Sequence, residues 1–378
     1  MSVFTQIGAV TAMNLRSIPR RLGSSCVIVI GIAGVVGVVV SVLGMTQSLS
    51  KTLVDTGRTD RAVVLRNGAD SELASTLLVD AVLTIKDAPG LARTPEGNAA
   101  ASEEMITAVN LLRKEDGTRT GVTVRGVAPE AFVVRPEVKL VEGRLFRPGL
   151  REMIVGSGAY AEFQGVEIGS EIGLRDSKWT VVGVFESGGD AHESGMMVDA
   201  ATLLSAYQRT AVNSVTVLLE SDAAFEDFKT ALTTNPTLSV SVEREDAFYE
   251  RQSESASGTL NVVAMSVGAI MALGALFGAL NTMYSAVSTR TVEIATLRAI
   301  GFGAGGVVVS VLAEALVLAV LGALLGAAIA WVLFSGNTIS LGGGVSSMVV
   351  QMQVTPGLLG LGIAWACAVG FLGGLFPA

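Results

Sequence analysis

The chain has 378 residues, half of them hydrophobic and 16% charged, with a mean hydropathy of +0.57. Its charges are concentrated in residues 46–257, which hold 21 Lys/Arg and 32 Asp/Glu, whereas the other 166 residues hold five Arg and two Glu. This split predicts an acidic domain of soluble-type composition joined to membrane segments. It argues against a nucleic-acid partner, because phosphate binding needs clustered Lys and Arg.

Four apolar stretches are each long enough to cross a hydrocarbon core of about 30 Å, which takes roughly 20 helical residues. They are Ser24–Met45, Gly258–Val287, Gly303–Phe334 and Pro356–Phe376. The first exceeds the apolar region of a signal peptide and is followed by no Ala-x-Ala site, so we expect a retained span. Both cysteines, Cys26 and Cys367, fall inside these stretches, which leaves no disulfide framework for the acidic domain.

The few basic residues outside the acidic domain indicate the orientation of the spans. Three arginines precede the first span, and Arg290 and Arg298 lie between the second and third. Because basic residues favour the cytoplasmic side, residues 46–257 and the uncharged loop 335–355 are predicted to be extracytoplasmic. The leader, residues 1–23, has the spaced apolar residues and closing arginines of an interfacial amphipathic helix, with a frayed tail as the alternative.

Residues 46–257 alternate between strand-like and helix-like runs. Strands are predicted at Arg61–Arg66, Gly121–Val127, Met153–Val155, Trp179–Phe185, Ser214–Glu220 and Ser239–Glu243, and helices at Ser71–Lys86 and Ala223–Leu232. Closely spaced glycines indicate a β-rich subdomain at about residues 115–200, inserted into an α+β unit made from the flanking pieces. We therefore predict a multi-pass α-helical membrane protein of four spans, with a large α+β extracytoplasmic domain between spans one and two.

This domain has no recognisable catalytic or metal-binding motif. Its histidine, His192, is the only one in the chain and lies with Asp190 and Glu193 in a loop that we expect to be solvated, because a metal site needs more converging donors. The Gly-Lys dipeptide of a Walker A motif does not occur, and one histidine gives little basis for a catalytic triad. We predict that the chain is not an enzyme and binds no cofactor or metal.

Residues 288–302, between spans two and three, form a predicted cytoplasmic helix with one charged face. On a helical wheel this face covers roughly 140° and has two apolar residues in its middle. It comprises Arg290, Glu293, Ile294, Leu297 and Arg298. Apolar anchors ringed by charge are typical of a helix that docks into a partner's groove. The same residues also fit a short interfacial helix, with its arginines on lipid headgroups and its acid paired at i,i+3.

The run Leu280–Gly301, LNTMYSAVSTRTVEIATLRAIG, together with Glu314, closely resembles the C-terminal permease signature of MacB/FtsX-type (type VII) ABC transporters. The acidic domain resembles the periplasmic core domain of that family at Val141–Phe146, Glu152–Gly158 and Ile168–Phe185. The resemblance covers nearly the whole chain, in the same order and topology. It implies the inner (cytoplasmic) membrane of a bacterium, with the large domain in the periplasm.

For function, the resemblance implies that residues 288–302 form a coupling helix seated on a separate ABC ATPase subunit, which binds the ATP. It also implies a homodimer, ATP-driven movement of the periplasmic domain (mechanotransmission), and export of an amphiphile, peptide or lipid from the periplasm or outer leaflet. A periplasmic adaptor, an outer-membrane channel and membrane lipids are further expected partners. Two rival functions share this plan: a lipoprotein-extracting permease, and a transmembrane regulator of a cell-wall hydrolase that transports nothing.

Within the spans, one acidic residue and three glycine pairs are the remaining candidates. Glu314 is a functional candidate because ionisable groups at membrane depth are costly. Alternatively, the third helix begins late and leaves Glu314 near the cytoplasmic interface, bonded within the bundle. Glycine pairs at GxxxG spacing permit close helix packing, and none is assigned to a dimer interface: Gly274/Gly278, Gly322/Gly326 and Gly370/Gly374.

Overall fold

The computed structural model describes residues 22–288, 291–299, 304–334, 338–341, 348–352 and 354–376, together with Gly8, Thr11 and Ala12. The chain divides into two compact units. The membrane unit comprises Met1–Gln47, Ser257–Asn337 and Met352–Ala378, and the α/β unit comprises Ser48–Ala256 and Thr338–Gln351. The predicted leader helix, residues 1–23, lies almost entirely outside the described residues.

Four helices of the described chain are long and apolar enough to cross a membrane, which confirms the four predicted spans. They are α2 (Leu22–Thr56), α8 (Glu245–Ser288), α10 (Ala304–Phe334) and α11 (Pro356–Leu375). A short helix, α9 (Thr291–Ala299), follows α8 in the sequence. Pro356 occupies the first turn of α11, where its missing N–H removes no helical hydrogen bond.

Two of these helices are longer than the apolar stretches that predicted them. Helix α2 continues past Met45 to Thr56, because its polar extension TQSLSKTLVDT contains no Gly or Pro to break it. Helix α8 begins at Glu245 rather than at Gly258, and the two acidic residues of its first turn suit the positive end of the helix dipole. From Ser48 of α2 and up to Ala256 of α8, these polar extensions belong to the α/β unit.

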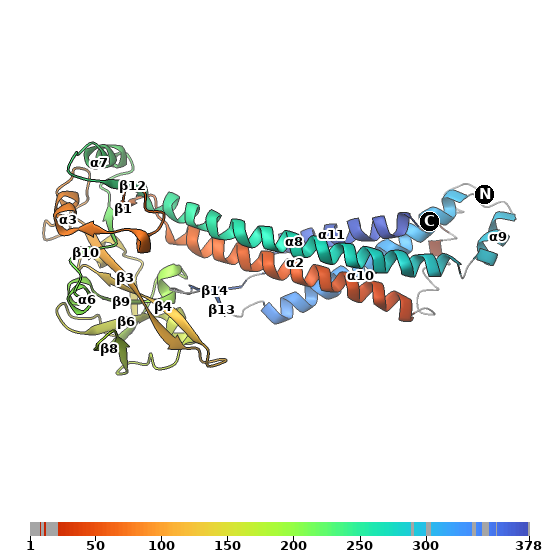
Figure 1. The fold of residues 1–378 in the computed structure, drawn as a ribbon, viewed down its shortest axis with the longest axis horizontal. Helices are drawn as coiled ribbons and strands as arrows, with labels where there is room; N and C mark the ends of the chain where they lie inside the picture. The colour runs from red at the N-terminus through yellow and green to blue at the C-terminus, as the bar shows by residue number, and fades with distance from the viewer. Residues whose placement is uncertain are drawn as a thin grey trace. The chain divides into compact units, whose positions relative to one another are not determined.

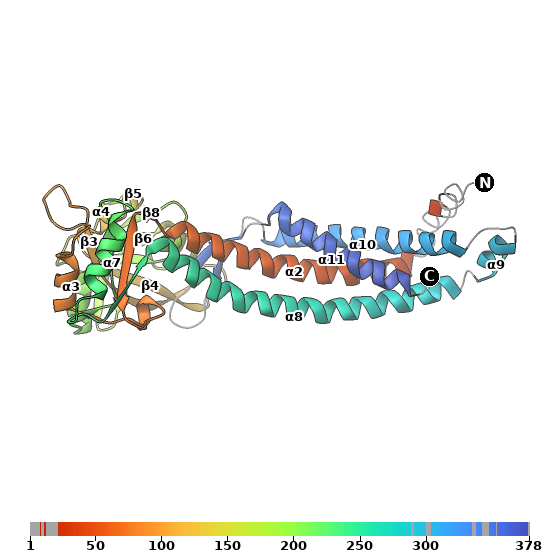
Figure 2. The same cartoon turned by 90° about the horizontal axis from the view of Figure 1, so that it is seen from above.

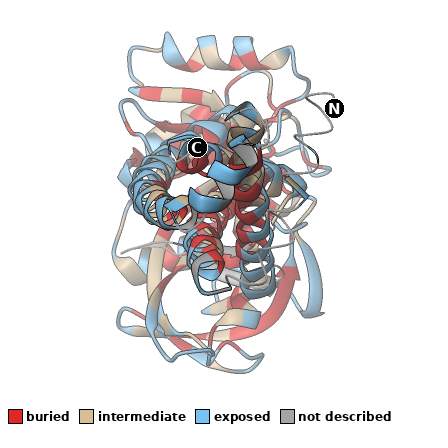
Figure 3. Cartoon of the chain, turned by 90° about the vertical axis from the view of Figure 1, so that its right-hand side faces the viewer, coloured by how far each residue is buried: buried red, intermediate tan, exposed pale blue. Residues whose placement is uncertain are grey.

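Small residues let the helices of the membrane unit approach closely (Figure 2). A Cβ added at Gly322 of α10 would lie 2.9 Å from the carbonyl oxygen of Val29 of α2, and one at Gly326 would clash with Ala33. The pair Gly370/Gly374 of α11 packs in the same way against alanines of α10. Two of the three glycine pairs thus serve packing within the chain. Buried positions accordingly face the interior of the bundle (Figure 3).

The α/β unit is built on a ten-stranded sheet with the order β12-β1-β11-β3-β4-β9-β6-β8-β5, in which β7 also pairs with β8 (Figure 1). The pairs β4–β9 and β6–β8 are parallel. Its strands are β1 (Arg61–Arg66), β3 (Ala101–Leu112), β4 (Arg119–Val127), β5 (Lys139–Gly143), β6 (Glu152–Gly156), β7 (Glu171–Leu174), β8 (Ser177–Glu186), β9 (Met196–Asp199), β11 (Ser214–Leu218) and β12 (Val240–Arg244). Two smaller sheets pair β2 (Leu77–Leu78) with β10 (Ala211–Val212), and β13 (Thr338–Leu341) with β14 (Met348–Gln351).

Two large hydrophobic cores divide the α/β unit into two lobes. In lobe 1, α3 (Val79–Lys86) and α7 (Ala224–Thr233) pack with β1, β11 and β12 around the fully buried Phe228. In lobe 2, α5 (Ser157–Glu162) and α6 (Ala200–Tyr207) pack with β4 and β6–β9 around Trp179. Strand β3 runs through both lobes, because Ala101 belongs to the first core and Met105 to the second. The short helix α4 (Ala131–Val134) follows β4.

The helix predicted at Ser71–Lys86 is wrong over its first half. Only α3 is α-helical there, preceded by the 3-10 turn η2 (Glu72–Ala74) and by β2. The reason is a set of long-range contacts that override local propensity. The amide of Asn213 donates to the carbonyls of Glu72 and Ser75 at 3.1 and 3.2 Å, and the Ser75 hydroxyl accepts from the N–H of Arg66 at 2.9 Å.

Candidate functional site

The polar extensions of α2 and α8 join the α/β unit through neighbouring strands of lobe 1. Helix α2 leads through Gly57 toward β1, and β12 leads directly into α8, while β1 and β12 pair with each other. A Cβ at Gly57 would lie 2.5 Å from the Cα of Asp246, so this close approach requires glycine. Ser253 of α8 donates to the hydroxyl of Ser50 of α2 at 2.7 Å.

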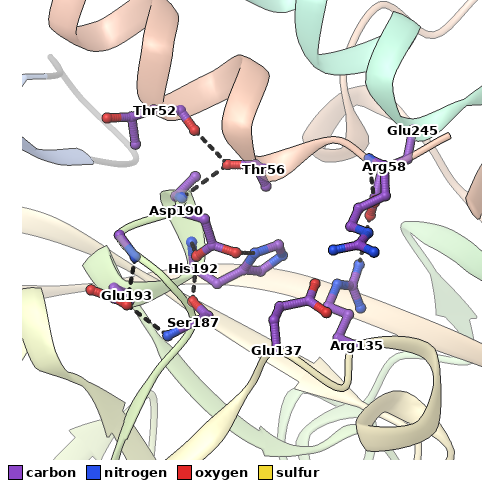
Figure 4. Close-up of polar contacts among 12 residues, drawn as sticks. Thr52, Thr56, Arg58, Arg135, Glu137, Ser187, Asp190, His192, Glu193 and Glu245 are labelled. Carbon is purple, nitrogen blue, oxygen red and sulfur yellow. Dashed lines mark hydrogen bonds and ion pairs between the residues drawn. The ribbon is translucent and has the colours of Figure 1, made fainter.

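A buried cluster of charged side chains lies where α8 begins (Figure 4). Glu245, whose side chain is fully buried, lies 2.6 Å from Nε of Arg61 in β1 and 3.6 Å from Arg135. Arg61 also lies 2.6 Å from Glu137 and donates to the carbonyl of Val134 at 3.2 Å. The segment 135–138 connects α4, whose Ala131 packs against β6, β8 and β9, with β5, which pairs with β8. This cluster therefore links the first residue of α8 to lobe 2.

The cluster continues into the sheet through Glu104 of β3. Its fully buried carboxylate contacts the guanidinium groups of Arg135 and Arg125, and Arg125 of β4 lies 2.8 Å from Glu72. Burial alone would raise the pKa of Glu104, but the two guanidinium groups outweigh it and lower this pKa to about 2. Glu104 is therefore ionised at neutral pH, and an unbroken series of ion pairs connects lobe 1, β3 and α8.

The loop Ser187–Gly195, which we call the hub loop, connects β8 with β9 and contains the 3-10 turn η3 (Ala191–Ser194). Asp190 caps this turn: it accepts from the N–H of His192 at 2.9 Å, contacts the Ser187 hydroxyl and lies 3.1 Å from Nδ1 of His192. Burial opposes the ionisation of Asp190, but its contacts with His192 and Ser187 prevail and lower its pKa. Glu193 accepts from the N–H groups of Ser187 at 2.6 Å and Gly189 at 2.8 Å.

The prediction that His192 lies in a solvated loop is wrong, since its side chain is only 3% exposed. Two carboxylates of the loop bind its backbone N–H groups, and this internal bonding allows polar residues to be buried. The loop also reaches α2, because Ala191 donates its N–H to the hydroxyl of Thr56 at 2.9 Å (Figure 4).

The polar side chains of the hub loop and of the charged cluster are bonded mainly to one another. Ser187 donates its hydrogen bond to Asp190, so His192 is not placed to activate that hydroxyl as a base would. Among the described residues, no group of three His, Cys, Asp or Glu side chains could hold a metal ion. The charged cluster and the hub loop instead fasten the ends of α2 and α8 to both lobes.

The predicted coupling segment contains helix α9, with backbone described for residues 291–299. Arg290 lies outside the described residues, and only the backbone is described at Glu293, Ile294, Leu297 and Arg298. On the opposite face, Val292, Ala295 and Ala299 are exposed, with Val292 at 80%. The assignment of the charged face to an ATPase contact stays a prediction.

Glu314 is buried in α10, at 5% exposure. Helix α10 already begins at Ala304, so the late helix start is wrong, while the burial of Glu314 agrees with the expectation that it lies within the bundle. A Cβ at Gly374, near the end of α11, would lie 2.8 Å from Cβ of Ala315. Since the 20 residues of α11 extend about 30 Å, one membrane thickness, Glu314 lies level with one end of that span. The 31-residue α10 is long enough to continue beyond this level.

Sequence reasoning missed the charged cluster, although the sequence contains a signal for it. Arg125 interrupts the strand-like run Gly121–Val127, and Arg135 follows the apolar run Ala131–Val134. A charge inside an apolar run is buried only when it is paired. The partners could not be read from the sequence, because Arg61 and Glu137, for example, are 76 residues apart.

Comparison with known protein families matches two regions of the chain. Residues 24–235 match the MacB-like periplasmic core domain, and residues 265–378 match the FtsX-like permease C-terminal domain.

Two curated relatives carry the name macrolide export ATP-binding/permease protein MacB. The protein from Neisseria meningitidis serogroup A is 26% identical over 341 residues, which cover 85% of this chain and 50% of the relative. The protein from Bdellovibrio bacteriovorus is 26% identical over 387 residues, with 93% and 56% covered. This chain thus spans about half the length of the curated relatives it matches.

Two solved structures are similar to part of the chain. The extracellular domain of the noncanonic ABC-type transporter YknZ from Gram-positive bacteria has a TM-score of 0.36 and 16% identity, covering 48% of this chain and 99% of that one. The periplasmic region of MacB from Actinobacillus actinomycetemcomitans has a TM-score of 0.39 and 13% identity, covering 51% and 92%.

Proposed function

The chain belongs to the MacB/FtsX-type family of ABC transporter permeases, and we propose that it couples ATP hydrolysis by a partner ATPase subunit to movements of its α/β unit. In this proposal the protein lies in a bacterial inner membrane with the α/β unit in the periplasm. The movements drive export of an amphiphile, peptide or lipid taken from the periplasm or the outer leaflet. Two curated relatives are named for macrolide export, and an amphiphilic cargo agrees with that name.

The observation that carries the proposal is the continuity of α8. This helix has 44 residues without interruption, about 66 Å. It begins at Glu245 inside the buried charged cluster and ends at Ser288, shortly before α9. A displacement imposed on α9 would therefore reach the α/β unit along a single helix, whose far end is Glu245, 2.6 Å from Arg61.

Helix α9 supports the ATPase contact through its position and exposure. It lies between two spans, in a segment whose basic residues favour the cytoplasm. Its Val292 face is exposed, which places α9 at the surface of the chain. We assign the docking contacts to the charged face, with Leu297 and Arg298 at its centre and edge.

A second copy of the chain is the other partner that we propose, with α8 at the interface. Of the most apolar 18 residues of α8, only 17% is buried, against 39% of the corresponding residues in each of the other three spans. No described atom lies within 4 Å of a Cβ built at Gly274 or Gly278, whereas the other two glycine pairs are used within the chain. The exposed Ile270 and Phe277 share the uncovered side of α8. The pair Gly274/Gly278 is therefore our candidate for close packing against another copy.

Purification from the native membrane tests the ATPase contact directly. We expect the tagged chain to retain an ATP-binding protein, and the double variant Leu297→Asp/Arg298→Asp to lose at least about tenfold of it, because a buried apolar anchor becomes charged. The matched control is Ala295→Asp/Ala299→Asp on the opposite face, which should retain the partner. Equal retention by both double variants would contradict the docking assignment. The other bound proteins and lipids would identify an adaptor and the cargo class.

A further inference from the structure

We propose that the hub loop makes lobe 2 follow the membrane helices, with Thr56 as the positioning residue. The inference rests on the proposed function and adds the route by which motion reaches lobe 2. Such a route is needed because α2 and α8 connect along the chain only to β1 and β12, both in lobe 1. Lobe 2 is attached to these two helices only through side-chain and backbone contacts.

The first of these contacts joins the hub loop to the end of α2. Thr56 is the last residue of α2 and is 1% exposed. Its hydroxyl donates to the carbonyl of Thr52 at 2.7 Å and accepts from the N–H of Ala191 at 2.9 Å (Figure 4). One hydroxyl thus bonds the last turn of α2 to the hub loop, and its orientation is fixed from both sides.

The hub loop also meets the segments that lead to spans two and four. The buried side chain of His192 points from the hub loop toward the charged cluster that contains Glu245, the first residue of α8 (Figure 4). Strand β14 lies beside η3 and α5, and the chain continues from β14 into α11. One loop of lobe 2 therefore adjoins the entries to three spans.

The hub loop is in turn held firmly to lobe 2. Gly195 accepts from the N–H of Gly156 at 2.9 Å, and Glu193 accepts from the hydroxyl of Ser157 at 2.9 Å. A Cβ added at Gly156 would collide with the backbone of Glu193, so β6 and η3 are in backbone contact. A displacement of Ala191 would therefore pass directly to β6 and α5, which pack in the core of lobe 2.

Pulsed electron paramagnetic resonance on the full chain tests this proposal. Spin labels replace the exposed Lys51 of α2 and Asp176 of lobe 2, after Cys26 and Cys367 are changed to Ala. We expect one narrow distance distribution for the parent chain and for Thr56→Ser, which keeps the hydroxyl. We expect a broadened or shifted distribution for Thr56→Val and for Asp190→Asn, which loosens the hub loop. Thr52→Val is the matched control, because it keeps the backbone carbonyl that Thr56 uses.

The outcomes separate a positioning role from a purely structural one. Broadening in Thr56→Val, with an unchanged thermal unfolding midpoint, supports the hub loop as the connection. A distribution for Thr56→Val that stays as narrow as that of Thr56→Ser overturns it, whatever Asp190→Asn does. In a complex with the ATPase, Thr56→Val should hydrolyse ATP at the parent rate while lobe 2 no longer follows α2. If the label distances in the parent complex do not change with the bound nucleotide, the proposed function fails. The distance distributions of the chain alone still test whether the hub loop connects lobe 2 to α2.

Discussion

Different interactions stabilise the α/β unit and the membrane unit, each within itself. In the α/β unit, Glu104, Arg125, Arg135 and Glu245 are buried as an ion-pair network between strands and lobes. In the membrane unit, α10 contacts α2 and α11 through closely packed glycine and alanine. We therefore expect the stability of the α/β unit to be most sensitive to the loss of one charge. We expect that of the membrane unit to be most sensitive to an added methyl group.

The largest expected effect is at Glu104. Changing Glu104→Gln leaves the guanidinium groups of Arg125 and Arg135 without their shared carboxylate, which should destabilise the α/β unit by roughly 3–5 kcal/mol. Its neighbour Glu103 is the comparison, because its pair with Lys86 is only partly buried and Glu103→Gln should cost less than Glu104→Gln. Denaturant unfolding followed by Trp179 fluorescence, with Trp331 and Trp365 changed to Phe, measures both. Equal losses would remove the distinction between fully and partly buried pairs.

The same network predicts a pH dependence. The pKa of Glu104 falls from its ordinary value of 4.5 to about 2 in the folded chain, so its contribution is complete above pH 4.5 and is lost as the pH falls toward 2. The free energy of unfolding of the parent should therefore exceed that of Glu104→Gln by a constant amount at pH 5–7. This gap should narrow below pH 4.5. If the difference in free energy of unfolding between the parent and Glu104→Gln stayed constant down to pH 3, the charge of Glu104 would not be the source of the stability.

Replacing glycine with a larger residue should destabilise the membrane unit at some positions and not at others. Gly326→Val places side-chain atoms against the backbone of Ala33 and should destabilise the helix bundle by about 1–3 kcal/mol. A Cβ at Gly274 meets no described atom within 4 Å, so Gly274→Val should leave the stability of the single chain unchanged while weakening the proposed dimer. Thermal unfolding and cross-linking in detergent micelles report the two effects separately. Loss of single-chain stability in Gly274→Val would show that α8 is covered by its own chain.

The smallest effect is expected at a surface pair of lobe 2. Arg144 forms two hydrogen bonds of 2.6 Å with Glu152 but is 45% exposed, so solvent screens the pair. Arg144→Ala should lower the free energy of unfolding by less than about 1 kcal/mol, measured by the same Trp179 fluorescence. A loss as large as that of Glu104→Gln would mean that exposure does not set the strength of these pairs.

The sequence predicted those parts of the fold that depend on local pattern. The four spans followed from apolar length, and strands such as Arg61–Arg66 followed from their composition. The helix expected at residues 71–76 failed because Asn213, far along the chain, holds that segment in another conformation. The burial of His192 and the charged cluster were not predicted for the same reason, since each depends on partners that only folding brings together.

The coupling segment is a different case. Its helical wheel and its resemblance to a family signature indicated a docking helix, and a helix is present at Thr291–Ala299. No comparison within a single chain can test the contact itself, because the contact requires a second protein. The identity of the docking residues therefore depends on the purification experiment proposed above.

The central claim is that ATP hydrolysis moves the α/β unit relative to the membrane unit. The most direct test is a distance between spin labels at the exposed Asp176 of lobe 2 and the exposed Ser285 of α8, in the complex with the ATPase reconstituted in a bilayer. We predict that the mean distance differs between the ADP-bound and the vanadate-trapped states. An identical distance distribution in both states, in a complex that hydrolyses ATP, would contradict the account.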